Sequence, residues 1–283
     1  MDQRIINLYD EYTHKPLTRK EFLQRLTKLV GSTAAAMALL PMLESCYTKS
    51  AASSTDGLFS EYISWPGANG EMKAYVARPA QEKAYAAVVV IHENRGLNAH
   101  IEDVARRAAR AGYLAVAPNA LAPLSGTPAD EDAARQLFRT LKQEDSDENF
   151  IRVFPQLQAR KDCNGKFGCV GFCWGGAMAN TLAVHVPELK AAVAFYGRQA
   201  AAEDVPKIKA ALQLHYAGLD ERINAGKDAY AEALTNAGVT FEQYVYEGVN
   251  HAFHNDTSAA RYDEVAAKLA WERTLAFFKK HLA

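Results

Sequence analysis

The chain has 283 residues, of which 49% are hydrophobic and 23% charged, and its formal net charge at pH 7 is −1. This length and composition fit one large folded domain with an ordinary core and exclude an intrinsically disordered chain. Because the charge is balanced and no Lys/Arg-rich tract occurs in the body of the chain, we expect no nucleic-acid partner and favour a small-molecule substrate. The four cysteines are too few for a disulfide scaffold and lack the spacing of a structural zinc site, so we expect no metal and no cofactor.

Residues 1–55 differ from the rest and predict an export signal followed by a linker. Residues 18–23 read TRKEFL, which resembles a twin-arginine signal with Lys20 in place of the second arginine, and a short apolar stretch follows. Cys46 ends a loose lipobox, and lipidation there would give a membrane anchor. We therefore expect export to the periplasm or cell envelope, with membrane contact only if the signal or the anchor is retained. The alternative is an amphipathic N-terminal helix that packs on the body of a cytoplasmic protein.

The remaining residues, 56–283, predict a single α/β domain. Two alternating segments, 62–65 and 72–77, are separated by a turn-rich stretch and predict an antiparallel hairpin. Short, nearly continuous apolar runs predict a buried parallel sheet, and they cover residues 86–91, 113–117, 167–170, 191–195, 211–216 and 241–246. Helical stretches cover residues 101–110, 130–142, 176–185, 225–236 and 259–280. This order predicts a mostly parallel, doubly wound sheet with helices on both faces and a leading antiparallel hairpin.

A nucleophile motif directly follows the run 167–170. Residues 171–176 read GFCWGG, which is the G-x-nucleophile-x-G elbow with Cys173 where serine is usual. Such an elbow sets the nucleophile on a strained strand-to-helix turn and indicates acyl-transfer chemistry. The alternative is a buried structural cysteine beside a Gly-rich loop, because free cysteine is among the most buried residue types.

Partners for Cys173 follow in the order that an α/β-hydrolase requires. Asp220 comes after the run 211–216 and His251 after the run 241–246, both at the carboxyl ends of predicted strands, where α/β sheets bind ligands. His251 would exchange a proton with Cys173, while Asp220 would orient the imidazole. The sequence therefore predicts a Cys-Asp-His triad that hydrolyses an acyl substrate through an acyl-cysteine.

The oxyanion hole is expected from two backbone N–H groups. Trp174 supplies the first, since it follows the nucleophile. The loop at residues 92–96 follows the strongest predicted strand and reads HENRG, in which Asn94 is the expected second donor. His254, three residues after His251, is the competing candidate for the catalytic histidine.

From about residue 58 onward the chain resembles the dienelactone hydrolase family, the carboxymethylenebutenolidase-like branch of the α/β-hydrolases. The resemblance rests on Asp220 and on the segments 91–96 (IHENRG), 171–176 (GFCWGG), 195–197 (FYG) and 250–253 (NHAF). It implies the α/β-hydrolase fold, hydrolysis of a small lactone or ester, and a role for Glu93. In the family this carboxylate contacts the cysteine and helps to generate the thiolate when substrate binds. A nearby carboxylate opposes ionisation of a thiol, so we expect a neutral thiol in the resting enzyme.

The resemblance also bears on the substrate. Two family arginines that grip a substrate carboxylate fall near Pro123 and at Asn255 here, and neither position is arginine. Arg95 and Arg198 are the alternative groups for binding an anion. The full set of predicted substrate-binding residues is Arg95, Tyr196, Arg198, His254 and Asn255. A thioesterase or other acyl hydrolase and a non-catalytic small-molecule-binding relative are the alternatives to a lactone or ester hydrolase.

Overall fold

The computed structural model describes residues 1–44 and 57–283, so Cys46 and the predicted linker lie outside the described residues. A sheet of eight strands in the order β1-β2-β4-β3-β5-β6-β7-β8 forms its centre. The strands are β1 (Leu58–Pro66), β2 (Glu71–Pro79), β3 (Tyr85–Ile91), β4 (Leu114–Asn119), β5 (Cys163–Phe172), β6 (Leu189–Phe195), β7 (Ala211–Ala217) and β8 (Phe241–Tyr246). The pairs β1–β2 and β2–β4 are antiparallel, and the other pairs are parallel. The predicted hairpin and the six predicted parallel strands are confirmed.

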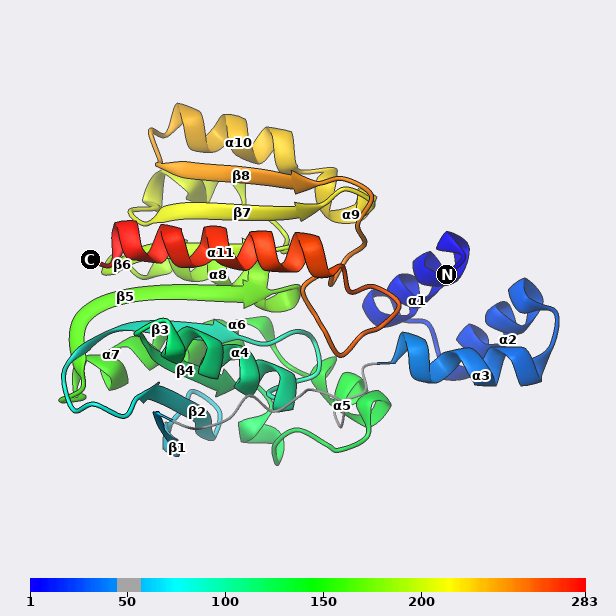
Figure 1. Cartoon of the computed structure of the whole chain (residues 1–283), viewed down its shortest axis with the longest axis horizontal. Helices are drawn as coiled ribbons and strands as arrows, with labels where there is room; N and C mark the ends of the chain where they lie inside the picture. The colour runs from blue at the N-terminus through cyan, green and yellow to red at the C-terminus, as the bar shows by residue number, and fades with distance from the viewer. Residues whose placement is uncertain (45–56) are drawn as a thin grey trace.

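Helices cover both faces of this sheet, which confirms the predicted fold class (Figure 1). Those of the body are α4 (Ala99–Arg110), α5 (Glu131–Phe138), α6 (Gln143–Ile151), α7 (Val153–Gln158), α8 (Trp174–His185), α9 (Glu221–Asn224), α10 (Lys227–Asn236) and α11 (Glu264–His281), with short 3-10 turns at η2 (Ala122–Leu124) and η3 (Ala202–Lys207). The sequence patterns missed α6, α7 and α9. These helices are short, and α6 begins with the charged sequence QEDSDEN, which gives little apolar periodicity.

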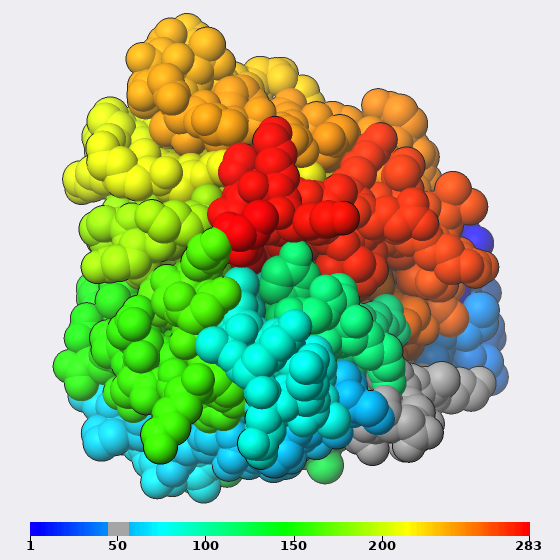
Figure 2. Space-filling model, turned by 60° about the vertical axis from the view of Figure 1, so that its left-hand side comes forward, coloured from blue at the N-terminus to red at the C-terminus, as the bar shows by residue number. Residues whose placement is uncertain are grey.

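The two faces of the sheet carry separate cores. Every side chain of β3 is buried, and successive residues alternate between the two cores, as the period of a strand requires. Apolar side chains of α4 and α11 complete one core, and those of α6, α7, α8 and α10 complete the other. Seen from the side of the C-terminus, the red residues of α11 lie between the orange part of the chain and the green and cyan parts (Figure 2).

The strand order places a ligand site at the centre of the sheet. The central strand β3 has β4 on one side and β5 on the other, so the order of connection reverses there. Open α/β sheets bind ligands at such a switch point, beyond the carboxyl ends of the strands. The loop at residues 92–96 follows β3, and Cys173 follows β5, so both segments identified in the sequence reach this edge.

The N-terminal residues form three helices, α1 (Gln3–His14), α2 (Arg19–Val30) and α3 (Thr33–Leu43). They share a small core of their own, and α1 lies beyond the carboxyl edge of the sheet, where β5, β7 and β8 end (Figure 1). The TRKEFL segment starts α2, where Thr18 and Glu21 form a capping box and Phe22 is fully buried. Among the described residues no single helix is long and apolar enough to cross a membrane; α2 and α3 pass that test together but are bent by 111°.

Candidate active site

The nucleophile elbow has the strained geometry that the motif predicts. Cys173 has φ 57° and ψ −112°, a conformation that residues other than glycine rarely adopt. Two glycines allow the tight turn: a Cβ on Gly171 would lie 1.8 Å from the carbonyl oxygen of Gly175, and a Cβ on Gly175 would lie 2.4 Å from that of Ile91. The turn therefore holds the thiol at the start of α8, above the carboxyl end of β5.

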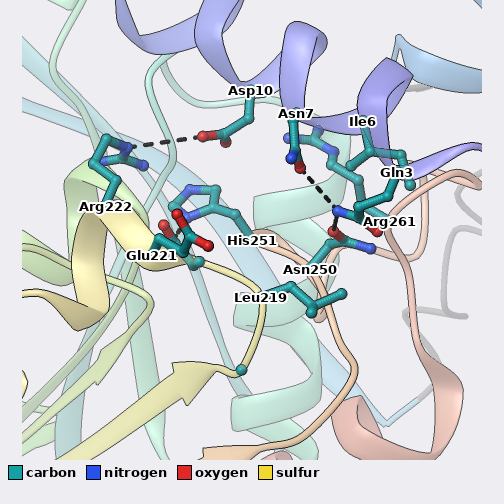
Figure 3. A pocket seen from close by; sticks show the side chains of 12 residues that line it. Gln3, Ile6, Asn7, Asp10, Leu219, Glu221, Arg222, Asn250, His251 and Arg261 are labelled. Atoms are coloured by element: carbon teal, nitrogen blue, oxygen red, sulfur yellow. Dashed lines mark hydrogen bonds and ion pairs between the residues drawn. The ribbon is translucent and has the colours of Figure 1, made fainter.

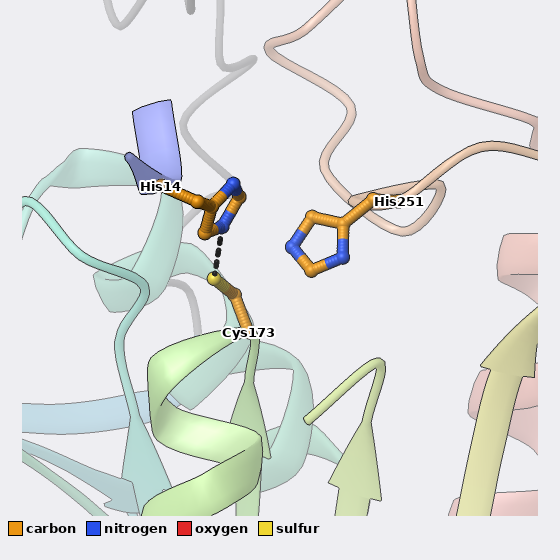
Figure 4. Close-up of side chains that lie close together, drawn as sticks. All are labelled: His14, Cys173 and His251. Atoms are coloured by element: carbon orange, nitrogen blue, oxygen red, sulfur yellow. Dashed lines mark hydrogen bonds between the residues drawn. The ribbon is translucent and has the colours of Figure 1, made fainter. Parts of the chain in front are cut away.

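Asp220 and His251 meet as predicted. Asp220 caps α9 by accepting a hydrogen bond from the backbone N–H of Ile223, and its other oxygen lies 2.5 Å from Nδ1 of His251. Both side chains are buried. Burial disfavours the charged forms of both groups, but their mutual attraction and hydrogen bond outweigh the effect of burial. The pKa of His251 is therefore raised well above its ordinary value, and the pKa of Asp220 is lowered. The carboxylate thus fixes the imidazole with Nε2 directed toward Cys173 (Figure 4).

A second histidine, which the sequence did not predict at the site, contacts Cys173. His14 is the last residue of α1, and its Nε2 lies 3.2 Å from Sγ of Cys173 (Figure 4). Its Nδ1 pairs with the carboxylate of Asp10 at 3.2 Å, one helical turn earlier. The rings of His14 and His251 contact edge to face, with their centroids 4.8 Å apart. The sequence holds one signal for this role, the i, i+4 spacing of Asp10 and His14, which allows a carboxylate to orient an imidazole on one helix face. These residues lie in the segment that the sequence predicts to be an export signal.

The two imidazoles change the state of the thiol. Burial alone raises the pKa of a cysteine, but the positive charges of His14 and His251 outweigh it and lower the pKa of Cys173 from 9.0 to about 6. The expectation of a neutral resting thiol was therefore wrong. It considered only the carboxylate of Glu93, whose Oε2 accepts a hydrogen bond from Asn255 (2.8 Å). The two imidazoles therefore favour the thiolate form of Cys173.

Side chains of α5 and of two loops of the body hold α1 over the site. Asn94 donates a hydrogen bond to the carbonyl oxygen of Thr13 (3.0 Å), so the loop after β3 binds the end of α1 directly. Arg135 donates to the carbonyl oxygen of Tyr12 (2.8 Å) and stacks on its ring, with 3.8 Å from the guanidinium carbon to the ring centroid. At the start of α1, the side chain of Gln3 donates a hydrogen bond to Oδ1 of Asn250, the neighbour of His251.

Two pockets flank this contact. One, of about 410 Å³, is lined by Cys173, Trp174 and Tyr196 together with His14 and His251. The other, of about 330 Å³, lies between α1 and the loops that carry Asp220 and His251, and Figure 3 shows Asp10 above His251 there. Only the first of the two is lined by Cys173, the predicted nucleophile, so it is the candidate substrate pocket.

Cationic side chains surround the pocket that contains Cys173. The lining residues include Lys15, Arg139, Arg198 and Arg222, all of them exposed, and among the described residues no Asp or Glu lines it. Arg222 also pairs with Asp10 at 3.7 Å. The pocket therefore presents positive charge to any ligand that reaches the thiol.

The predicted oxyanion donors lie on the same pocket. Trp174 is the first residue of α8, where a helix leaves its N–H groups without intrahelical partners, and Asn94 lines the pocket from the loop after β3. The side chain of Asn94 binds α1, a use that the sequence did not reveal.

The predicted substrate-binding residues divide into two groups. Tyr196 and Arg198 line the pocket that contains Cys173. Arg95 is buried and binds Asn94, Tyr9 and Glu131, so it holds the loop and α1 together.

Two further candidates are also outside that pocket lining. His254 is buried, with its ring stacked on Phe172 (4.9 Å between centroids), and its position does not favour it as the catalytic base. The amide of Asn255 is engaged between Glu93 and Thr257. The sequence placed these side chains at the correct edge of the sheet but could not tell which way they point.

Comparison with known proteins identifies the family. The profile of the dienelactone hydrolase family matches residues 72–282. The chain belongs to the dienelactone hydrolase family. A provisionally named carboxymethylenebutenolidase of Yersinia pestis is 32% identical over 243 residues, which cover 80% of this chain and 90% of that protein. The crystal structure of a provisionally named dienelactone hydrolase from Klebsiella pneumoniae has a TM-score of 0.71 and 29% identity, and covers 78% of this chain and 98% of its own.

This dienelactone hydrolase relative is accordingly a hydrolase that acts on esters, with a small ester or lactone as its substrate. A second provisionally named carboxymethylenebutenolidase, from Methylorubrum extorquens, is 29% identical over an alignment that covers 94% of this chain and 96% of that protein. A share of 94% is too large to leave out all of residues 1–44. The similarity thus extends into the N-terminal helical segment.

Proposed function

We propose that this hydrolase uses Cys173 as its nucleophile, His251 as its acid and base, and Asp220 to orient His251. The observation that supports this proposal is the convergence of the strained thiol and the Asp220–His251 pair on one pocket. A thiolate next to a charged imidazole is the form of cysteine that attacks carbonyl groups.

The reaction would take two steps. Sγ of Cys173 attacks the carbonyl carbon, the C–O bond to the leaving oxygen breaks, and that oxygen takes the proton from Nε2 of His251. His251 then removes a proton from water, the hydroxide attacks the thioester carbon, and the C–S bond breaks to release the acid and the thiolate. The backbone N–H groups of Trp174 and Asn94 would stabilise the oxyanion of each tetrahedral intermediate.

The charges around the pocket favour an ester or lactone that carries a negative group. Lys15, Arg139, Arg198 and Arg222 line the pocket, whereas the family positions near Pro123 and at Asn255 have no arginine. We propose that these four cations replace the missing pair by attracting the anionic group, with the acyl carbon at Cys173.

A substrate panel tests the proposal. Wild type, Cys173→Ala and the matched control Cys163→Ala are assayed on p-nitrophenyl esters, enol-lactones, acyl-thioesters and short peptides, and an acyl adduct is sought by mass spectrometry. We expect ester or lactone hydrolysis and an adduct on Cys173 in wild type and Cys163→Ala, and neither in Cys173→Ala. Activity that survives in Cys173→Ala would refute the assignment of the nucleophile. Turnover of acyl-thioesters alone would identify a thioesterase instead.

A further inference from the structure

Three side chains that commonly ligate metals converge at the nucleophile. His14, Cys173 and His251 each present one ligand atom, and these atoms lie within 4.8 Å of one another (Figure 4). They come from α1, from the elbow and from the loop after β8. Because these segments are far apart in the sequence, no spacing motif could have revealed the cluster, and the sequence analysis expected no metal.

Each histidine of the cluster is backed by a carboxylate. Nδ1 of His14 lies 2.9 Å from the backbone carbonyl oxygen of Asp10 and 3.2 Å from its Oδ1, and Nδ1 of His251 lies 2.5 Å from Oδ2 of Asp220. Metal-ligating histidines almost always donate their second ring N–H to such a partner, which fixes the tautomer and the orientation of the ring. Both Nε2 atoms are left facing Sγ of Cys173. Nε2 of His251 is buried and has no hydrogen-bond partner among the described residues.

We propose that Nε2 of His14, Sγ of Cys173 and Nε2 of His251 form a binding site for a thiophilic divalent transition-metal ion, of which Zn²⁺ is the representative. One thiolate and two imidazoles suit such an ion, whereas Mg²⁺ and Ca²⁺ take oxygen ligands. A tetrahedral zinc site with these ligands needs donor atoms about 3.3–3.6 Å apart. His14 and Cys173 already lie 3.2 Å apart, and small side-chain rotations bring in His251. Water would fill the fourth position.

Metal binding would inhibit the hydrolase reversibly. The thiolate donates an electron pair to the metal, and the protons on the two Nε2 atoms pass to solvent, so neither the nucleophile nor the acid is left for an ester. A chelator would restore both. The site would be a second use of Cys173 that requires neither ester hydrolysis nor an acyl intermediate, so its test is independent of the proposed function.

A cobalt titration tests the site, because a thiolate bound to Co²⁺ gives a sulfur-to-metal absorption band that is independent of activity. The full chain without a histidine tag is titrated with Co²⁺ and then with competing Zn²⁺, and Zn²⁺ affinity is measured by calorimetry. The variants are Cys173→Ser, His14→Gln and His251→Gln. The matched controls are Cys163→Ser and His185→Gln, which change the same residue types outside the cluster, and thermal unfolding checks that each variant folds.

We expect one equivalent of Co²⁺ with a thiolate band in wild type and both controls, displaced by Zn²⁺. The band should be absent in Cys173→Ser, and the affinity should fall at least about tenfold in His14→Gln and in His251→Gln. The proposal is overturned if wild type shows no thiolate band. It is also overturned if folded His14→Gln binds Zn²⁺ as tightly as His185→Gln does, because the ion would then not be held by α1.

Discussion

Replacing His14 should return the thiol of Cys173 toward an ordinary cysteine. The pKa of Cys173 is lowered from 9.0 to about 6, although burial opposes ionisation and His14 and His251 are the favourable charges. One pH unit corresponds to about 1.4 kcal/mol, so the surroundings favour the thiolate by about 4 kcal/mol. An opposite charge at contact distance typically shifts a pKa by about 1–3 units. His14→Gln keeps a polar side chain, removes the charge 3.2 Å from Sγ, and should raise the pKa to about 7–9.

Alkylation measures this change. The rate of iodoacetamide labelling at Cys173 is followed across pH by mass spectrometry, and its midpoint gives the pKa. A pKa of about 8 would leave roughly a tenth of the thiol ionised at pH 7, against roughly nine tenths in wild type. The full profile is needed because a thiolate of lower pKa is intrinsically less nucleophilic. His185→Gln, on an exposed position of α8, is the control. An unchanged midpoint in His14→Gln, with α1 still protected from hydrogen exchange, would refute this account of the thiolate.

Three further predictions concern pH, the elbow and the N-terminus. For an ester substrate, kcat/KM should rise through about pH 6 as Cys173 loses its proton. It should fall above the ordinary histidine range as His251 loses its own proton, because the pKa of His251 is raised. A pH–rate profile whose rise lies near pH 9 would contradict this. Gly171→Ala should destabilise the fold by about 3 kcal/mol or more, because its Cβ would lie 1.8 Å from a backbone oxygen. Gly238→Ala, with φ +70° and open space, should cost only about 1–2 kcal/mol, and equal losses in chemical denaturation would refute the steric argument. Export predicts a processed chain in the envelope fraction, which N-terminal sequencing checks, and an intact Met1 in the cytoplasmic fraction would contradict it.

The sheet and the order of the site residues could be predicted because both depend on local patterns. Buried strands such as β3 appear in the sequence as short apolar runs, and Cys173, Asp220 and His251 each follow one of them. Because parallel strands end at the same edge of the sheet, the positions of these residues in the sequence were enough to predict that they lie close together.

The direction of the side chains and the role of the first helix could not be predicted. His254 and His251 are three residues apart, yet the ring of His254 stacks on Phe172 whereas His251 lines the pocket that contains Cys173. Ala252, which lies between them, has φ 66° and turns the chain. The composition of residues 1–44 favoured an export signal, and nothing in it showed that α1 docks on a surface formed by distant loops. The predicted environment of the Cys173 thiol was incomplete for that reason, because His14 is one of the two imidazoles that lower its pKa.

His14 lies 159 residues before Cys173 in the sequence, so a cleavage that removed the first helices would change the surroundings of the thiol. A peptidase that cut after α3 would remove Asp10 and His14 together with all three N-terminal helices. Precursor and mature protein would then share the Asp220–His251 pair but differ in one imidazole at the thiol. The precursor would have the more acidic cysteine and, by our inference, the metal site. The mature enzyme would have a more open pocket and a thiol that depends on His251 alone.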